Sequence, residues 1–298
     1  MIKVLTNMRT VVSFFILVSL VITLSPLLSY PAHLVLENFV DYPFHKLVSH
    51  VTLICGLIFS GFYLKYHQMY SKQAFGFGLS KNIFLRDILQ GLFAGVLILA
   101  FIKLILILSG VHQIKPNLEY FWSSLLLIFF KAILAGLVIG FIEESIFRGA
   151  LFSGLYKKTN ALIAISLTSF VYAAVHFFKY RELPEGSEIT WLTGMELLPD
   201  AFFKFSYPNI TDHFLTLFTL GVLLSMIRLR NGNIALCIGI HAGIIMALKI
   251  AGRFSEYVSG SQFDFMVNWV DHTLGYLSFV WLLILAIIYW WRYLFTRM

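Results

Sequence analysis

A long apolar run, FWSSLLLIFFKAILAGLVIGFIEESIFRGALFSGLY, covers residues 121–156. Runs of about 18 or more apolar residues are long enough to cross the hydrocarbon core of a bilayer as a helix. Three ionisable residues, Glu143, Glu144 and Arg148, nevertheless lie inside this one. Charged groups are costly in a membrane and usually mark a functional site there. The run therefore predicts both a transmembrane helix and a site within it.

The composition of the whole chain supports the same fold class. Of its 298 residues, 59% are hydrophobic and only 12% are charged, which is about half the charged fraction of a soluble domain. We predict an all-α, polytopic transmembrane helical bundle with about eight spans, forming a single transmembrane domain over residues 1–298. The predicted spans are approximately 10–30, 44–65, 86–109, 121–156, 160–179, 212–229, 233–250 and 274–295. The first resembles a signal sequence, but its apolar run is long, so we expect a retained span.

The loops between these spans alternate in charge. Basic residues cluster in one set of loops and acidic residues in the other: Lys65, Lys72, Lys81, Arg86, Lys157, Lys158, Arg228 and Arg230 against Glu37, Asp41, Glu182, Glu185 and Glu188. Cytoplasmic loops of membrane proteins are enriched in lysine and arginine. We therefore expect cytoplasmic N and C termini in a multi-pass protein of the cell (inner) membrane. This distribution also explains the net charge of +7. We therefore expect the lipid bilayer to be the protein's partner, and we expect no binding to nucleic acid.

Several other polar residues have simpler interpretations. Lys103 and Lys131 fall near the outer ends of their spans, where a long side chain can reach the interface. Most histidines lie at span ends or in loops and are expected at the interface. Cys55 and Cys237 lack metal or disulfide spacing and are interpreted as small core residues. The outer segment 180–211 is predicted to be a lid, an interfacial helix or a connecting loop.

The charged residues of the long run divide into a pair and a single carboxylate. Glu144 and Arg148 are four residues apart with the acid first, which places them on one face of a helix in the favourable order. Glu143 points about 100° away and lacks a cation on its own helix. A carboxylate in apolar surroundings without a cation can take up a proton near neutral pH, which suits a general base. The alternative is a polar cluster that only ties helices together.

Two histidines lie deep in later spans. His176 follows the turn at Lys158 by about 18 residues, and Glu143 precedes it by about 15, so two antiparallel helices bring them to the same height. His241 is expected at a somewhat shallower level if all the turns are coplanar.

These segments resemble the motifs of the CPBP family of intramembrane endopeptidases, which includes type II CAAX prenyl-proteases and bacteriocin-processing enzymes. EESIFR, residues 143–148, is similar to the EExxxR motif, YAAVH, residues 172–176, to FxxxH, and HAGII, residues 241–245, to HxxxN. The three motifs occur in the family's order over a catalytic core of about 121–250. Their order is more specific than any one of them.

The resemblance implies hydrolysis of a peptide bond in or near the membrane, in a membrane-associated peptide or protein substrate. It implies that Glu143 activates water with the assistance of His176 and that His241 lies near the oxyanion. Glu144 and Arg148 would support this site. A glutamic-type peptidase of this kind needs no cofactor, but one glutamate and two histidines could also hold zinc as in a metalloprotease. The absence of an HExxH motif favours the metal-free interpretation.

The sequence departs from the family pattern at two positions, which are also candidates for the substrate pocket. Tyr172 replaces the phenylalanine of the second motif and adds a hydroxyl group. Ile245 replaces the asparagine of the third and cannot donate a hydrogen bond. Loss of one oxyanion donor typically lowers the rate about 10²–10³-fold. The alternative function is therefore an inactive, non-enzymatic relative, such as an immunity or chaperone-like membrane protein. A proton-coupled transporter is disfavoured because no internal repeat is evident.

Overall fold

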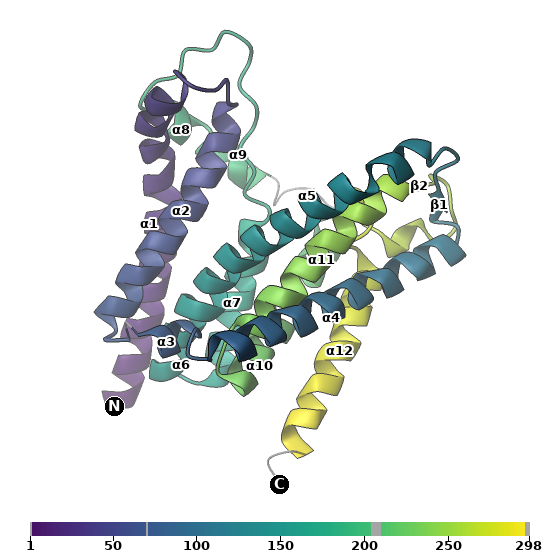
Figure 1. Cartoon of the computed structure of the whole chain (residues 1–298). Helices are drawn as coiled ribbons and strands as arrows, with labels where there is room; N and C mark the ends of the chain where they lie inside the picture. Colours follow the sequence, from purple (N-terminus) through teal and green to yellow (C-terminus); the bar gives the residue numbers. More distant parts are fainter. Residues whose placement is uncertain (1, 70, 204–209, 296–298) are drawn as a thin grey trace.

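The chain folds almost entirely into helices (Figure 1). A computed structural model describes residues 2–69, 71–203 and 210–295. The helices longer than ten residues are α1 (Ile2–Leu36), α2 (Phe44–Tyr66), α4 (Lys81–Leu108), α5 (Glu119–Glu144), α7 (Ala161–Val175), α10 (Thr211–Asn231), α11 (Ala235–Phe254) and α12 (Tyr276–Phe295). Shorter helices are α3 (Lys72–Phe75), α6 (Phe152–Lys158), α8 (Thr193–Glu196) and α9 (Leu198–Phe203). A π-helix, η1 (Ser145–Leu151), and a 3₁₀ turn, η3 (Asp264–Met266), complete the helical part.

The predicted number of about eight apolar helices is confirmed. Six helices of the described chain are long and apolar enough to cross a membrane: Met8–Leu36, Phe44–Tyr66, Lys81–Leu108, Phe121–Lys158, Thr211–Asn231 and Ala235–Phe254. The other two predicted spans form shorter apolar helices, Ala161–Val175 and Tyr276–Arg292. The first described turn of α1 and the last turn of α12 lie at the same end of the molecule (Figure 1). That this end is cytoplasmic stays a prediction.

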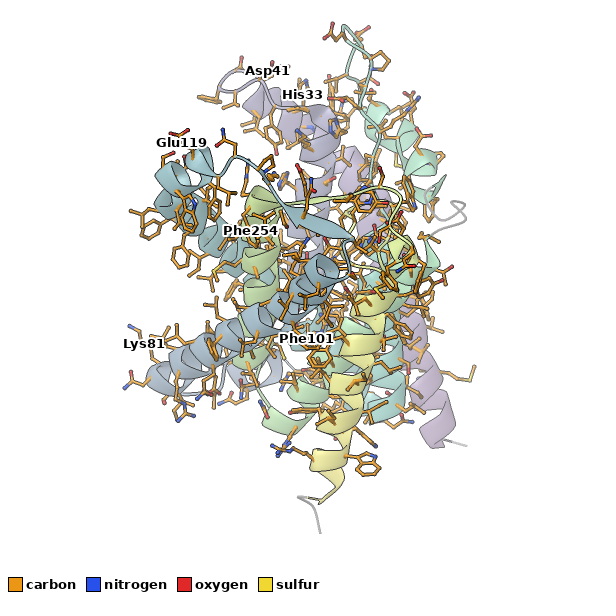
Figure 2. The ribbon with its side chains drawn as sticks, turned by 90° about the vertical axis from the view of Figure 1, so that its right-hand side faces the viewer. His33, Asp41, Lys81, Phe101, Glu119 and Phe254 are labelled. Atoms are coloured by element: carbon orange, nitrogen blue, oxygen red, sulfur yellow. The ribbon has the colours of Figure 1, made fainter. Side chains whose placement is uncertain are left out.

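The two ends of the bundle differ in charge, as the loop pattern predicts. Figure 2 shows Lys81 toward the end where the chain begins, with His33, Asp41 and Glu119 toward the opposite end. A two-stranded antiparallel sheet also lies at this opposite end, which we call the strand end. It pairs β1 (His112–Ile114) with β2 (Ser255–Tyr257), with His112 opposite Tyr257. The sheet joins the connection after α4 to the chain that follows α11.

The helices pack as three neighbouring groups. α11 lies against both α4 and α5, α10 lies between α7 and α12, and α1 pairs with α2. The α1–α2 pair contacts the rest of the bundle through η1, α6 and α8. Of the segment predicted as a lid, an interfacial helix or a loop, residues 180–203 and 210–211 are described and include α8 and α9. Leu197 and Ala201 pack there on the buried residues Phe44, Leu47 and Val48 of α2.

α11 is held by glycine contacts that the sequence analysis missed. Gly91 and Gly95 of α4 face Gly239 and Gly243 of α11 so closely that a Cβ at Gly95 would lie 2.1 Å from the Ile240 carbonyl oxygen. On the other side, a Cβ at Gly136 of α5 would lie 2.5 Å from the Ala242 oxygen. Small residues four apart let transmembrane helices approach closely. The GxxxG spacings in α4, α5 and α11 were a readable signal for this packing.

The prediction that Lys103 reaches the interface is wrong. Its side chain is buried, 5% exposed, and its ammonium group donates to Thr273 Oγ1 at 2.9 Å. His112, also expected at the interface, is 5% exposed and lies beside it. The chain between β2 and α12 folds over both residues and supplies their partners. Lys131 is exposed, as expected.

Candidate active site

The Glu143–Arg148 segment lies where an α-helix becomes a π-helix. α5 ends at Glu144 and continues without a break into η1, and then into α6 from Phe152. All seven residues of η1 are buried. Gly149 belongs to this turn, and a Cβ there would lie 3.0 Å from the Phe75 carbonyl oxygen, so glycine lets α3 approach. π-helical turns are rare and frequently occur at functional sites.

Glu144 and Arg148 form the predicted ion pair. Arg148 Nη1 lies 3.0 Å from Glu144 Oε1, with side-chain exposures of 1% and 0%. The second guanidinium nitrogen, Nη2, donates to the Gly221 carbonyl oxygen of α10 at 3.2 Å. The guanidinium carbon also lies 4.4 Å from the centre of the Tyr172 ring, within cation–π range. Hydrogen bonds to Glu144 Oε1 and from both terminal nitrogens of Arg148 offset part of the cost of burial, whereas Glu144 Oε2 and Arg148 Nε are buried without a hydrogen-bond partner in the described chain.

His241 binds the same glutamate. Its Nδ1 lies 2.8 Å from Glu144 Oε1, and donates to it because an ionised carboxylate can only accept. This bond leaves Nε2 directed toward Glu143, 3.8 Å from Glu143 Oε2. His241 thus lies as close to Glu143 as His176 does. The expectation of a shallower level is wrong because the helices are tilted relative to one another and their turns are not coplanar (Figure 1).

His176 approaches Glu143 from the other side. It follows the last residue of α7, and its Nδ1 donates to the Tyr172 carbonyl oxygen at 2.7 Å. Its Nε2 lies 3.7 Å from Glu143 Oε2, at the common height that the residue counts predict. The main-chain bond at Nδ1 fixes which ring nitrogen faces the carboxylate.

Glu143 Oε2 therefore lies near the Nε2 atoms of two histidines but forms no direct hydrogen bond with either. Both Nε2 distances, 3.7 and 3.8 Å, exceed hydrogen-bond length. Among the described residues, Glu143 Oε2 is a buried atom without a hydrogen-bond partner. A polar contact across more than about 3.5 Å is the usual place for a bridging water. One carboxylate oxygen therefore faces two imidazole nitrogens without bonding directly to either.

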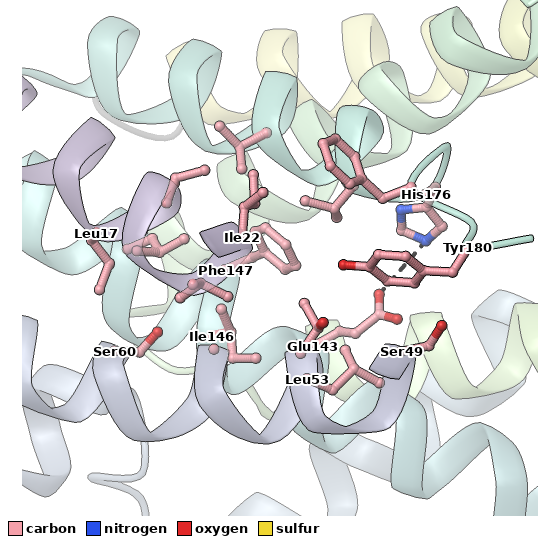
Figure 3. A pocket seen from close by; sticks show the side chains of 18 residues that line it. Leu17, Ile22, Ser49, Leu53, Ser60, Glu143, Ile146, Phe147, His176 and Tyr180 are labelled. Atoms are coloured by element: carbon pink, nitrogen blue, oxygen red, sulfur yellow. Dashed lines mark ion pairs between the residues drawn. The ribbon is translucent and has the colours of Figure 1, made fainter. Parts of the chain in front are cut away.

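Glu143 and His176 also line a cavity of about 240 Å³ (Figure 3). Its walls come from α1, α2, the end of α5, η1, α7 and the residues after α7. They are largely apolar, with Leu17, Ile22, Leu53, Ile146 and Phe147 among the lining residues. Ser49, Thr52, Ser60 and Tyr180 contribute hydroxyl groups. An apolar pocket with a few convergent polar groups is the usual form of a small binding site.

The two candidate pocket residues occupy different positions. Neither Tyr172 nor Ile245 is among the residues that line this cavity. Tyr172 is buried behind the histidines, with ring centroids 4.6 Å from His176 and 6.0 Å from His241. Ile245 is half-buried on α11, four residues beyond His241. Their roles toward a substrate stay predictions.

The geometry bears on the zinc alternative without deciding it. Among the described residues, no group of three or more histidine, cysteine, aspartate or glutamate side chains has the arrangement of a metal site. In addition, His241 Nδ1 and Arg148 already occupy Glu144. Glu143 would then have to serve both as a ligand and as the base. Metal dependence stays open to the experiment below.

Comparison with known protein families identifies the central part of the chain. Residues 122–246 fit the family model described as "Type II CAAX prenyl endopeptidase Rce1-like". The matched range contains α11 up to Met246 and includes Glu143, Glu144, Arg148, His176 and His241. No curated protein and no solved structure matches the chain.

Proposed function

Because residues 122–246 belong to the CPBP family of intramembrane endopeptidases, we propose that this protein hydrolyses a peptide bond in or near the membrane with Glu143 as general base. One observation carries the proposal. Glu143 Oε2 is buried without a hydrogen-bond partner in the described chain, faces two imidazole nitrogens, and belongs to a residue that lines an apolar cavity. A water molecule bound there would contact Glu143 as the base and the two imidazole nitrogens.

The reaction follows from these positions. Glu143 takes a proton from the bound water while the water oxygen attacks the carbonyl carbon of the peptide bond. His176 holds the water, because its Nε2 faces the same carboxylate oxygen. The carbonyl oxygen becomes negatively charged, and the proton on Glu143 then passes to the leaving nitrogen as the C–N bond breaks. The products are a carboxylate and an amine.

His241 is suited to the developing negative charge. Two carboxylates and one guanidinium leave the buried cluster with one excess negative charge, and a protonated His241 makes it neutral. The Nδ1 proton is held by Glu144, so an Nε2 proton is available to the oxyanion. A donor that is preorganised in a buried position, as the 5% exposed His241 side chain is, stabilises such a charge strongly. This donor offsets part of the loss caused by Ile245 in place of asparagine.

The substrate is a membrane-associated peptide or protein. The cavity beside Glu143 is lined by helices of the bundle and is apolar over most of its wall. A segment that enters it must shed water from its side chains, which favours apolar residues next to the cleaved bond. The second candidate function is a non-enzymatic relative of the family. Ile245 is the specific observation that favours it.

A cleavage assay in proteoliposomes tests the proposal. Purified protein is incubated with a panel of C-terminal peptides and signal-peptide remnants, and the products are identified by mass spectrometry. Glu143→Gln should lower the rate at least about 100-fold, because a general base typically contributes about 10²–10⁴-fold. Glu185→Gln, at an exposed position of the 180–203 segment, is the matched control and should retain the wild-type rate.

Three outcomes would contradict parts of the proposal. Full turnover by Glu143→Gln would remove Glu143 from the role of base. A wild-type protein that cleaves nothing in the panel, although it is folded, would favour the non-enzymatic relative. Activity that a membrane-permeant chelator abolishes and zinc alone restores would establish a metal mechanism.

A further inference from the structure

Arg228 is a buried cation that contacts the π-helix from another helix. It lies in α10 with 7% of its surface exposed. Its Nε donates to the Arg148 carbonyl oxygen at 3.0 Å. Its Nη2 donates to the Ala74 carbonyl oxygen at 3.1 Å and to Ser153 Oγ at 3.0 Å. One side chain therefore joins α10 to η1, α3 and α6.

These contacts are unusual because all three acceptors are neutral. Removing a guanidinium from water costs several kcal/mol, and main-chain carbonyls and a hydroxyl repay this less than a carboxylate does. The sequence pattern places Arg228 among the basic loop residues, yet Arg230, two residues later, is exposed. The two arginines share a helix and a charge but differ in their surroundings. The burial of Arg228 is explained by the segments that its guanidinium N–H groups hold in place.

What it holds is the main chain of the glutamate motif. Arg148 of η1 donates to the Gly221 carbonyl oxygen of α10, and Arg228 of α10 donates to the Arg148 carbonyl oxygen. Gly221 and Arg228 are about 10 Å apart along the helix axis. Arg148 and Arg228 therefore each hydrogen-bond to the other's helix, and together they connect η1 and α10 at two levels along the helix axis. We call this pair of contacts, with the bonds of Arg228 to α3 and α6, the brace. A guanidinium is planar and presents its donors in a fixed geometry, which a lysine cannot reproduce.

We propose that Arg228 is a positioning residue for the site. It fixes the height of the Arg148 main chain and thereby the Arg148–Glu144 ion pair. Glu144 in turn holds His241 Nδ1, so the orientation of the His241 ring relative to Glu143 depends on a residue that touches neither. The link to catalytic rate rests on the proposed function, whereas the link to the His241 ring does not.

The test compares Arg228→Lys and Arg228→Met with Arg230→Lys. Arg230 lies on the same helix, its guanidinium is 5.5 Å from the Tyr289 ring centre, and its replacement makes the same chemical change outside the brace. Two readouts are taken on folded protein in detergent: kcat and KM for a cleaved peptide, and the ring ¹⁵N signals of labelled histidines, with His241 assigned by its absence in His241→Gln.

The expected result separates positioning from folding. Arg228→Lys should lower kcat at least about tenfold with KM within about twofold, because misplacing catalytic groups by about 1 Å costs rate rather than binding. Arg228→Met should lower it further, so lysine is a partial rescue. The His241 signals should shift in both variants and stay unchanged in Arg230→Lys. Wild-type kcat together with unshifted His241 signals in Arg228→Lys would overturn the proposal.

Two further arms keep the test decisive. If both Arg228 variants fail to fold, Ser153→Ala removes only one acceptor of the brace and should still shift the His241 signals. Unshifted signals in that variant would overturn the proposal. If the wild type cleaves no peptide, the proposed function fails. The ¹⁵N signals still decide whether Arg228 orients His241.

Discussion

In the described chain, a cluster around Glu143 and a cluster at the strand end both contain buried ionisable groups, and the two are built differently. The glutamate cluster comprises Glu143, Glu144, Arg148, His176 and His241. The strand-end cluster comprises Lys103, His112, Asn268, Asp271 and Thr273. Both lie among apolar helices, where each unpaired charge is costly.

In the strand-end cluster, fixed neighbours satisfy the charge. Asp271 Oδ1 accepts from Asn268 Nδ2 at 2.9 Å and from the main-chain nitrogens of Thr273 and Leu274, each at 2.8 Å. Lys103 donates to Thr273 Oγ1, and His112 Nε2 donates to the His272 carbonyl oxygen at 2.6 Å. Fully satisfied networks of this kind make one conformation specific. We infer a structural role: the cluster closes the chain between β2 and α12 over the end of α4.

In the glutamate cluster, the charged groups are only partly satisfied. Glu144 Oε1 accepts from Arg148 and His241, although Glu144 Oε2 and Arg148 Nε are buried without a partner in the described chain. Glu143 Oε2 is also without a hydrogen bond there, and it faces two imidazole nitrogens at 3.7 and 3.8 Å. An unsatisfied buried acceptor costs about 1–3 kcal/mol, so a purely structural cluster gains nothing by retaining it. The difference teaches that burial of charge by itself does not identify a site. A carboxylate oxygen that lacks a fixed partner, faces two imidazoles and belongs to a residue lining a cavity is the stronger indication.

The largest effect on stability is expected at the Glu144–Arg148 pair. Arg148→Ala strands Glu144 as a buried charge with only His241 beside it, and breaking a buried pair typically costs about 3–5 kcal/mol. The double variant Glu144→Gln/Arg148→Ala removes the stranded charge and should recover part of that loss. Unfolding free energy in mixed micelles is the measurement.

A surface pair is the matched control for Arg148. Arg86 lies 3.3 Å from Asp87, with 64% of its side chain exposed, and exposed ion pairs contribute about 0–1 kcal/mol. Arg86→Ala should therefore change the unfolding free energy by less than about 1 kcal/mol. A double variant as unstable as Arg148→Ala alone would show that lost packing of the arginine, not the stranded glutamate, causes the loss.

A smaller effect, without loss of activity, is expected from Lys103→Met. The change removes the donor to Thr273 Oγ1 and should lower the unfolding free energy by about 1–3 kcal/mol. The cleavage rate per folded molecule should stay at the wild-type value, because Lys103 belongs to the strand-end cluster. A rate loss as large as that of Glu143→Gln would remove the distinction between the two clusters.

The sequence predicts those parts of the structure that depend on local spacing. Apolar runs locate the helices because a bilayer requires about 20 apolar residues in a row. The four-residue spacing of Glu144 and Arg148 predicts their ion pair, which survives the π-helical turn. The counts from Lys158 predict that Glu143 and His176 meet. Each inference uses only the rise or the period of a helix.

The other features of the structure depend on the tilt of the helices and on the paths of the loops, which residue spacing along one helix does not determine. His241 reaches the level of Glu143 because α11 lies tightly against α4 and α5 through glycine contacts. Lys103 is buried because the chain between β2 and α12 supplies Thr273 as its partner. Arg228 turns into the bundle rather than toward the interface because η1, α3 and α6 offer three acceptors there. In each case a segment distant in the sequence decides the environment of the residue.

The smallest effect is expected from pH at the strand end. Burial lowers the pKa of His112, and the nearby Lys103 ammonium lowers it further, because a second positive charge there would face the first at 3.4 Å. The unfolded chain, where the histidine pKa is about 6.5, then binds the proton more readily than the folded one. Stability from this group is therefore complete above about pH 6.5 and decreases as the pH falls below it, by at most about 1.4 kcal/mol per pH unit. Unfolding free energies between pH 5 and 8 should fall less steeply in His112→Gln than in the wild type, with Lys103→Met between the two. Equal slopes in all three proteins would show that His112 is not the group that titrates.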